Sequence, residues 1–275
     1  MSFFESLAEI EKRGHSAALC TIIRERGSVP RHIGSKMIVY ADGGIEGTVG
    51  GGEMESRVIK EALAALDKGA TRIVSYQLVD PNAGDPGVCG GEVEIFVEPI
   101  KPYPTLLVIG GGHVGRALVH LGKWLGFRVV LSDDRPEFCS PESAPGADVY
   151  LPVPMAELPN HFKFNSETYI VMPTRGAPLD VAGLPTLLDT PHAYLGVIGS
   201  RRRWATAVKR LEKKGVPTEK LAHVHAPMGL ELNAETPEEI ALSILAEIVM
   251  LRRGGTGEAM KLVPDTKSEL QEAGS

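Results

Sequence analysis

The spacing of apolar residues divides the chain into two segments that meet near residue 100. In the first segment, alternating apolar and polar positions predict β-strands, which fall at residues 17–24, 36–40, 45–49, 72–78 and 92–98. Apolar residues at helical spacing predict a first helix that ends at Gly14 and a second from about Glu53 to Asp67. Ser2 and Glu5 have the spacing of a capping box for the first helix. This segment has the mixed pattern of an α+β unit.

The second segment follows a different pattern, in which short apolar runs rich in β-branched residues alternate with helical spacing. The strands predicted there are residues 106–109, 128–132, 168–172 and 194–198. The helices predicted there lie near residues 113–125, 179–189, 200–213 and 236–252. Alternation of strands and helices is typical of a parallel sheet with helices on both faces.

The stretch Pro99-Ile100-Lys101-Pro102-Tyr103-Pro104 lies between the two patterns and favours an extended spacer, because three of its six residues are proline. We therefore predict an α/β protein with an N-terminal α+β domain followed by a Rossmann-like parallel-sheet domain. The predicted boundaries are 1–98 for the first domain, 99–104 for a linker, 105–255 for the second domain and 256–275 for a flexible tail.

Composition narrows the class of protein. The chain has 275 residues, of which 43% are hydrophobic and 23% charged, as in soluble globular proteins. Its net charge of −6 argues against non-specific nucleic-acid binding. No run approaches the roughly 18 apolar residues of a membrane-spanning helix, and Glu5 and Glu9 make the N-terminus too acidic for a signal peptide. The three cysteines are widely spaced, which fits a reducing compartment, so we expect a cytoplasmic protein without membrane or nucleic-acid partners.

A glycine-rich turn in the second segment matches G-x-G-x-x-G through Gly110, Gly112 and Gly115. It follows a predicted strand and opens a predicted helix, the context in which such turns bind phosphate. Asp133 ends the next strand, where an acidic side chain accepts from a ribose hydroxyl in dinucleotide sites. Asp134 competes with it for this role, and Arg135 is placed to contact a 2′-phosphate instead. The alternative is a Rossmann-like fold whose turn binds nothing.

A second glycine turn, at Gly50, Gly51 and Gly52, precedes the helix predicted from Glu53. Consecutive glycines weaken structure unless tight curvature or close approach requires them. From spacing alone, a backbone site for an anion and a sharp turn with positive φ explain this run equally well.

Cys89 lies between glycines in a loop where a thiol can be exposed, and its thiolate could ligate a soft metal or accept sulfur. An inert thiol explains it as well. No cysteine, histidine or carboxylate shows a zinc-site spacing, so Cys89 is the only candidate metal ligand. Ser200 and Arg201 follow another predicted strand and open a helix, and basic residues at that end favour a bound anion, since they oppose the helix dipole. A solvated charged face is the alternative.

The motifs together resemble those of the xanthine dehydrogenase accessory factor (XdhC/CoxI) family. The resemblance covers about residues 1–255 in several blocks. These are Gly27-Ser28-Val29-Pro30-Arg31, Gly47-Thr48-Val49-Gly50-Gly51-Gly52-Glu53-Met54-Glu55, Cys89-Gly90-Gly91-Glu92-Val93-Glu94, the Rossmann turn, Thr174-Arg175-Gly176, Ile198-Gly199-Ser200-Arg201 and Ala234-Glu235-Thr236-Pro237-Glu238-Glu239-Ile240-Ala241.

The resemblance implies a molybdenum cofactor-binding chaperone without turnover chemistry of its own. Such a protein protects molybdopterin, or its dinucleotide form, during sulfuration by a cysteine desulfurase. It then delivers the cofactor to a xanthine dehydrogenase-like molybdenum hydroxylase, and a homodimer is implied as well. The sequence departs from the family pattern at Glu53, where many members have Cys, and at Ala177 and Pro178, where members often have His. These departures argue against direct metal coordination and any hydrolytic role.

Two other functions remain compatible with the Rossmann turn. An NAD(P)-dependent oxidoreductase is the main alternative, although no Lys, His or Tyr has the placement of a hydride-transfer acid. A nucleotide-sensing module is the other. For the chaperone, we expect one ligand between the two domains, held by backbone N–H groups at Gly50–Gly52 and Gly110–Gly115, with Asp133, Arg201 and Cys89 as side-chain contacts.

Overall fold

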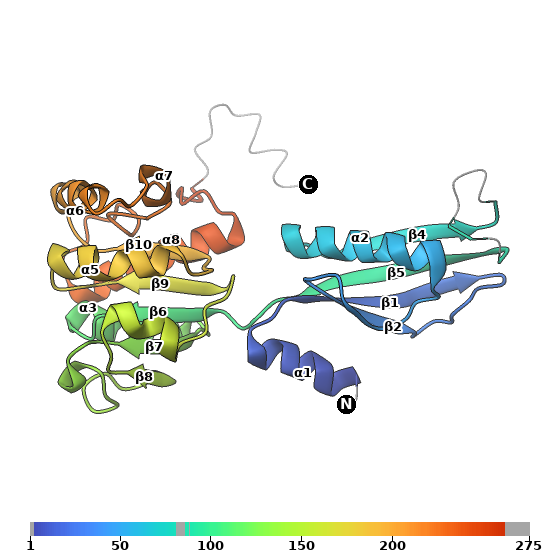
Figure 1. Cartoon of the computed structure of the whole chain (residues 1–275), viewed down its shortest axis with the longest axis horizontal. Helices are drawn as coiled ribbons and strands as arrows, with labels where there is room; N and C mark the ends of the chain where they lie inside the picture. Colours follow the sequence, from blue (N-terminus) through green and yellow to red (C-terminus); the bar gives the residue numbers. More distant parts are fainter. Residues whose placement is uncertain (1–2, 81–85, 88, 262–275) are drawn as a thin grey trace.

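A computed structural model describes residues 3–80, 86–87 and 89–261. It contains two five-stranded sheets, one before and one after residues 101–104, each with its own helices (Figure 1). The fold is therefore mixed α/β, an antiparallel sheet followed by a parallel Rossmann-like sheet, as the sequence predicts.

The first sheet is antiparallel and has the strand order β3-β2-β1-β5-β4. Two helices accompany it. The elements are α1 (Phe3–Arg13), β1 (Ala17–Arg26), β2 (Lys36–Tyr40), β3 (Ile45–Gly47), α2 (Gly52–Lys68), β4 (Arg72–Leu78) and β5 (Gly91–Ile100). Helix α2 packs on one face through buried Met54, Val58 and Ala62, whereas Ile10 of α1 packs on the other face against Ala17 and Ile38.

The second sheet is parallel and has the order β10-β9-β6-β7-β8. Its strands are β6 (Thr105–Ile109), β7 (Arg128–Ser132), β8 (Val149–Leu151), β9 (Thr168–Met172) and β10 (Tyr194–Val197). Its helices are α3 (His113–Trp124), α4 (Leu158–His161), α5 (Ala177–Leu188), α6 (Arg201–Lys213), α7 (Thr218–Leu221) and α8 (Pro237–Arg253), with short 3₁₀ turns η2 (Pro136–Phe138) and η3 (Met155–Glu157).

Helices cover both faces of the parallel sheet. Leu118 of α3 and Ile244 of α8 pack on one face, and Leu184 of α5 and Leu211 of α6 pack on the other. The chain leaves β6 for β7 and β8 on one side and returns to β9 and β10 on the other side. The direction of winding therefore reverses between β6 and β9, and ligands bind at such a switch point in doubly wound folds.

The strong periodic elements match the expectations, and the short ones do not. The strands predicted at 36–40, 72–78, 128–132 and 168–172 have the bounds of β2, β4, β7 and β9. Strand β8, at three residues, and helices α4 and α7, at four residues each, were not predicted, because they are too short to show a period. The predicted capping residue Ser2 and the tail beyond residue 261 lie outside the described residues.

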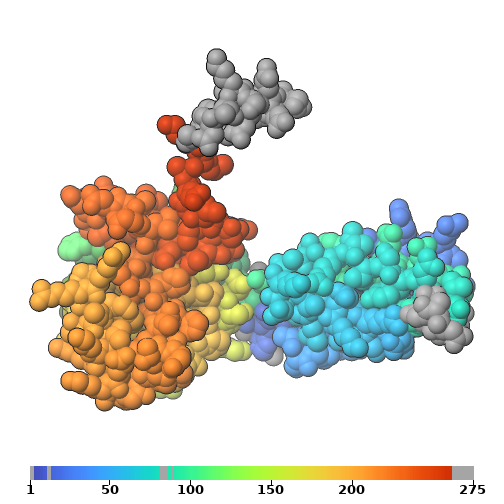
Figure 2. All heavy atoms as spheres, turned by 90° about the horizontal axis from the view of Figure 1, so that it is seen from above, coloured from blue at the N-terminus to red at the C-terminus, as the bar shows by residue number. Residues whose placement is uncertain are grey.

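The two glycine turns lie at opposite ends of the molecule. The C-terminal end of α2, at Gly69, faces Lys101 beside the chain crossing, so its N-terminal glycine turn lies at the far end of the first half (Figure 1). Strand β6 begins just after the crossing, so the carboxyl ends of the parallel strands point away from it. Figure 2 shows the two halves as separate masses side by side. A single chain in this arrangement cannot hold one ligand with both turns, contrary to our expectation.

Candidate functional site

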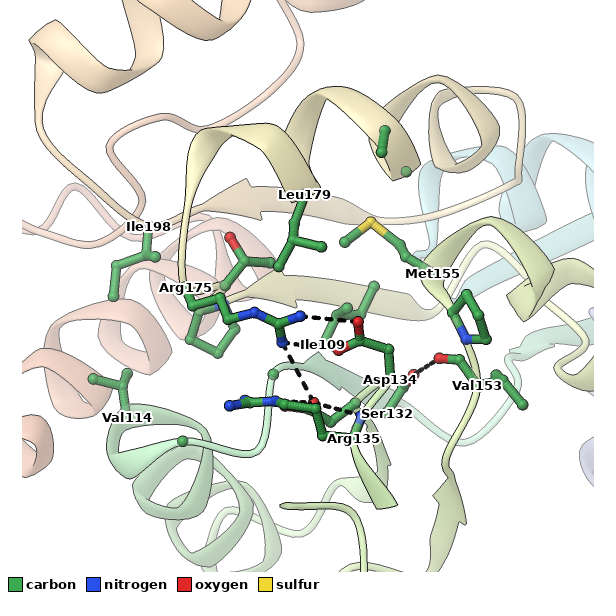
Figure 3. Close-up of a pocket in the computed structure, with 18 of the residues that line it drawn as sticks. Ile109, Val114, Ser132, Asp134, Arg135, Val153, Met155, Arg175, Leu179 and Ile198 are labelled. Atoms are coloured by element: carbon green, nitrogen blue, oxygen red, sulfur yellow. Dashed lines mark hydrogen bonds and ion pairs between the residues drawn. The ribbon is translucent and has the colours of Figure 1, made fainter. Parts of the chain in front are cut away.

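A cavity of about 580 Å³ opens at the carboxyl ends of the parallel strands, at the switch point between β6 and β9. All of its lining residues lie between Ile109 and Arg203. Apolar side chains make most of one wall, among them Met155, Leu179 and Ile198 (Figure 3). The guanidinium groups of Arg135, Arg175 and Arg203 also line it.

The glycines of the Rossmann turn serve different purposes. A Cβ at Gly115 would overlap the carbonyl oxygen of Gly110, and a Cβ at Gly111 would overlap that of Phe138. These two glycines are therefore required by close backbone packing. Gly112 is different, because a Cβ there would meet nothing within 4 Å and the residue borders the cavity. Gly112 is the N-cap of α3 and provides no side-chain cap, so the first amides of the helix are available at the cavity.

Asp133, predicted to bind a ribose hydroxyl, is already saturated with hydrogen bonds. Its side chain is 1% exposed. One oxygen accepts from the Gly111 amide at 2.8 Å and from Arg135 Nη2 at 2.9 Å. The other accepts from the Arg135 amide at 3.0 Å and from Arg135 Nε at 2.9 Å. A carboxylate has about four lone-pair sites, so Asp133 has none to offer a ribose. Its role in the structure is to fix the glycine turn and Arg135, which also stacks on Phe138 at 3.8 Å.

Asp134 turns outward and binds Arg175 instead. Arg175 Nη1 and Nη2 donate to its two oxygens at 2.8 and 2.9 Å (Figure 3). These hydrogen bonds from Arg175 lower the pKa of Asp134 below its usual value, and the same contact raises the pKa of Arg175. The pair is charged and bidentate, but its side chains are 35% and 46% exposed. Water therefore competes for both partners.

Arg203 is held from behind the cavity by a buried carboxylate. Its Nη2 donates to Asp180 at 2.7 Å and to Thr174 Oγ1 at 2.8 Å, and Asp180 is completely buried. Thr174 Oγ1 also donates to Asp180. Arg203 Nε is buried without a hydrogen-bond partner among the described residues. This network fixes the loop after β9 against the start of α6, so Arg203 serves as a structural cation at the edge of the cavity.

Ser200 and Arg201 lie outside the cavity lining. Ser200 is the N-cap of α6, as the sequence predicts, and its Oγ accepts from the Arg203 amide at 3.2 Å. Arg201 is exposed. The basic residues that do line the cavity, Arg175 and Arg203, were not selected as site residues. The available signal was position, since Arg175 follows the strand beside β6 and parallel strands end at the same edge.

The N-terminal glycine turn has an internal anion of its own. Gly50, Gly51 and Gly52 have φ values of 141°, 76° and 65°, which only glycine adopts readily. Glu55, one turn into α2, accepts from the amides of Val49 and Gly51 at 3.2 Å each. It also accepts from Thr48 Oγ1, which in turn accepts from the Gly50 amide at 3.1 Å. The amides of Gly50 and Gly51 are therefore engaged within the chain, and Glu55 is a functional part of this turn that the sequence did not single out.

Cys89 is exposed and lies near that turn, at the same end of the first half. Two residues after it, a Cβ at Gly91 would overlap Ser28, and a Cβ at Gly50 would lie 2.7 Å from Pro30. The turn at residues 27–30 thus contacts both the loop of Cys89 and the glycine turn. Three separate sequence blocks therefore meet at the end of the molecule far from the cavity. No cluster of three or more His, Cys, Asp or Glu side chains suited to a metal ion occurs among residues 3–80, 86–87 and 89–261.

Comparison with known proteins identifies the family. The model described as XdhC Rossmann domain matches residues 106–248, and the model described as XdhC and CoxI family matches residues 10–77. The chain belongs to the XdhC family. The cavity falls entirely within the part that matches the XdhC Rossmann domain, whereas Cys89 falls between the two matched ranges.

Three relatives illustrate the range of XdhC-like proteins. An uncharacterized protein YqeB of Escherichia coli is 34% identical over 262 residues, covering 94% of this chain and 48% of the relative. A protein of Bacillus subtilis described as a probable xanthine dehydrogenase component is 31% identical over 159 residues, covering 58% and 46%. The molybdenum cofactor insertion chaperone PaoD of E. coli is 23% identical over 269 residues, covering 87% and 84%. The chain thus spans about half the length of the first two relatives.

The described part of this XdhC family member contains no helix long and apolar enough to cross a membrane. A solved structure described as a xanthine dehydrogenase from Bacillus halodurans aligns with 98% of this chain and 100% of its own, at 22% identity and a TM-score of 0.49. This likeness is too low to carry an argument about function.

Proposed function

We propose that this protein binds the molybdenum cofactor and takes part in the maturation of a xanthine dehydrogenase-like molybdenum hydroxylase, with no turnover chemistry of its own. The observation that carries the proposal is the switch-point cavity, which combines an apolar wall with arginines and the uncapped start of a helix. Molybdopterin has a flat ring system and a phosphate. These two parts match an apolar wall and a cationic rim, respectively.

The residues around the cavity fit this ligand class. The apolar side chains of Met155 and Leu179 would receive the ring, and the amides at the start of α3, beyond Gly112, would donate to phosphate. Bound cofactor would supply molybdenum–dithiolene chemistry to the target enzyme. What this chain contributes is enclosure of the ligand, orientation through fixed donors and exclusion of water by the apolar wall.

The environment of Asp133 argues against the NAD(P)-dependent oxidoreductase. Dinucleotide sites use an acidic side chain at this position to accept from the adenosine ribose. In this chain, that carboxylate is buried and its hydrogen-bonding capacity is already used by Gly111 and Arg135. The chaperone function needs no such acceptor.

We extend the proposal to the first half of the molecule. The exposed Cys89 thiol is the candidate for sulfur handling or for contact with molybdenum, alongside a cysteine desulfurase as partner. Because the cavity and Cys89 lie at opposite ends of one chain, a homodimer would be needed to bring Cys89 near a ligand in the cavity. We also propose that the protein acts in the cytoplasm and that residues 1–98 and 105–255 are separate domains.

The function is tested by purifying the protein from cofactor-producing and cofactor-deficient hosts and measuring oxidised-pterin fluorescence and molybdenum in each. We expect pterin only from the producing host. Ala182→Trp, which fills the cavity from an exposed lining position, should remove it. Ala205→Trp, at an exposed position of α6 outside the lining, is the matched control and should retain it. No pterin from the producing host, together with tight NAD binding, would reject the chaperone function.

A further inference from the structure

Two aspartate–arginine pairs lie side by side at the mouth of the cavity and differ in how firmly they are held. Asp133 and Arg135 have side chains 1% and 32% exposed, whereas Asp134 and Arg175 are 35% and 46% exposed. Figure 3 shows both arginines beside Asp134 on one wall of the cavity. The first pair is built into the fold, and the second faces solvent.

The inner pair cannot release its arginine. Asp133 also holds the Gly111 amide at 2.8 Å, so removing its partner would leave a buried charge and disturb the glycine turn. The Phe138 ring lies against the other side of the Arg135 guanidinium at 3.8 Å. Arg135 is thus fixed between a carboxylate and a ring.

The outer pair can separate at small cost. Both oxygens of the Asp134 carboxylate accept from Arg175, and an exposed carboxylate is readily solvated once released. Arg175 Nη1 is also 3.8 Å from Asp133, so the guanidinium keeps a second negative neighbour at the cavity mouth. An incoming phosphate carries more charge than a carboxylate and accepts from the same planar fork of donors.

We infer that Arg175 is the phosphate receptor of this cavity and that Asp134 occupies it as an exchangeable latch until a ligand phosphate takes its place. The ligand class is a flat ring compound bearing a phosphate monoester. Its ring lies on the apolar wall, and its phosphate lies between Arg175 and the uncapped amides at the start of α3. This inference rests on the proposed function only in taking the cavity as the ligand site.

The latch opens by competition and not by acid. Arg175 lowers the pKa of Asp134 below its usual value, so the carboxylate stays charged throughout the neutral range. The other charged groups that face this pair are Asp133 and Arg135, and they remain paired with each other. Binding of a phosphate monoester is therefore expected to vary little between about pH 6.5 and 8, apart from the second ionisation of the phosphate near pH 6.

Dinucleotides are disfavoured at the same site. An extended dinucleotide would direct its second ribose to the end of β7, where Asp133 has no free acceptor and Arg135 is held in place. A phosphate monoester needs nothing from that end of the cavity.

The test uses the full chain and three probes: flavin mononucleotide, riboflavin and NAD. Flavin mononucleotide and riboflavin share a flat three-ring system and differ by one phosphate. We expect the wild-type protein to bind flavin mononucleotide at least about tenfold more tightly than riboflavin, because a charge-assisted bidentate contact has that magnitude. NAD should bind more weakly than flavin mononucleotide. Affinities are measured by flavin fluorescence quenching and by calorimetry.

Variants separate the receptor from the latch. Arg175→Ala should abolish the preference for flavin mononucleotide, and Asp134→Asn should tighten flavin mononucleotide binding about two- to fivefold while leaving riboflavin unchanged, as expected for an exposed ion pair. Arg210→Ala, which removes an exposed arginine of α6 outside the lining, should change neither affinity. Thermal unfolding of each variant checks that it is folded.

Several results would overturn the inference. Equal affinity for the two flavins, no binding of either, or an unchanged preference in Arg175→Ala would reject the receptor. An unchanged or weakened affinity in Asp134→Asn would reject the latch, and NAD binding as tightly as flavin mononucleotide would reject the ligand class. If the flavin results hold but no pterin copurifies, the phosphate site stands without the proposed function. If pterin copurifies equally with Arg175→Ala, the proposed function stands without the latch.

Discussion

At the scale of single residues, the environments of Asp133 and Asp134 differ sharply although the two are adjacent in the chain. The first is a buried structural acceptor, and the second is a surface partner of Arg175. Both follow the same strand and have the same side chain, so the sequence allowed either to be the ligand-binding acid. Only the positions of Gly111 and Arg135 in space decide between them.

Asp133→Asn should lower the free energy of unfolding by about 3 kcal/mol, because it leaves the partly buried Arg135 without its counter-charge. Asp134→Asn should cost less than about 1 kcal/mol, since its ion pair is exposed. Urea denaturation followed by circular dichroism measures both. Equal effects of the two substitutions would contradict the structural role assigned to Asp133.

The three cysteines should differ in reactivity. Burial raises the pKa of Cys20 to about 12 and also raises that of Cys139, so both thiols stay protonated at neutral pH and are shielded from reagents. Cys89 is exposed. Because the thiolate is the reactive form, a disulfide reagent such as dithiobis-nitrobenzoate should label one thiol per folded chain.

Cys89→Ser should remove that fast labelling, and all thiols that remain should react after denaturation. Rapid labelling of the folded Cys89→Ser variant would show that a buried cysteine is accessible. In the loaded protein, Cys89→Ala should lower molybdenum content more than it lowers stability, and an unchanged molybdenum content would argue against contact between Cys89 and the cofactor.

At the scale of elements, the Rossmann turn combines tight packing with one open position. Gly115→Ala should destabilise the protein by about 3 kcal/mol or more, because the added Cβ would overlap the Gly110 carbonyl and force α3 away from the sheet. Gly112→Ala meets no neighbour, so it should cost about 1 kcal/mol or less, the difference between glycine and alanine at an N-cap. Thermal unfolding of the two variants provides the measurement, and similar losses would mean that packing does not distinguish these glycines.

The elements also differ in how well their sequence predicts them. Long periodic elements such as α2 and α8 were expected within a few residues of their observed bounds. The predicted strand at residues 45–49 ends earlier, at Gly47, because Thr48 and Val49 bond to Glu55 instead of continuing the sheet. That contact joins residues from two elements, so no pattern within either element predicts it.

At the scale of the whole molecule, each sheet has its own buried core, and the described side-chain contacts between the halves include the Lys101–Glu167 ion pair at 3.3 Å and a Lys163–His15 contact at 3.1 Å. Exposed contacts of this kind couple two units weakly. Differential scanning calorimetry should therefore resolve two unfolding transitions. The addition of flavin mononucleotide should raise only the transition of the half that contains the cavity. A single transition with equal calorimetric and van't Hoff enthalpies would show that the halves unfold together.

The sequence by itself determined the class of each sheet, the order of the main elements and the two glycine turns, because these depend on local periodicity and on backbone conformations that glycine favours. Only the tertiary structure decided which groups remain available to a ligand. It engaged Asp133, Gly50 and Gly51 within the chain, brought Arg175 to the cavity and placed the two turns at opposite ends. These outcomes depend on contacts between residues far apart in the chain, and a hydrogen bond already made inside the protein removes a donor or acceptor that the sequence alone leaves free.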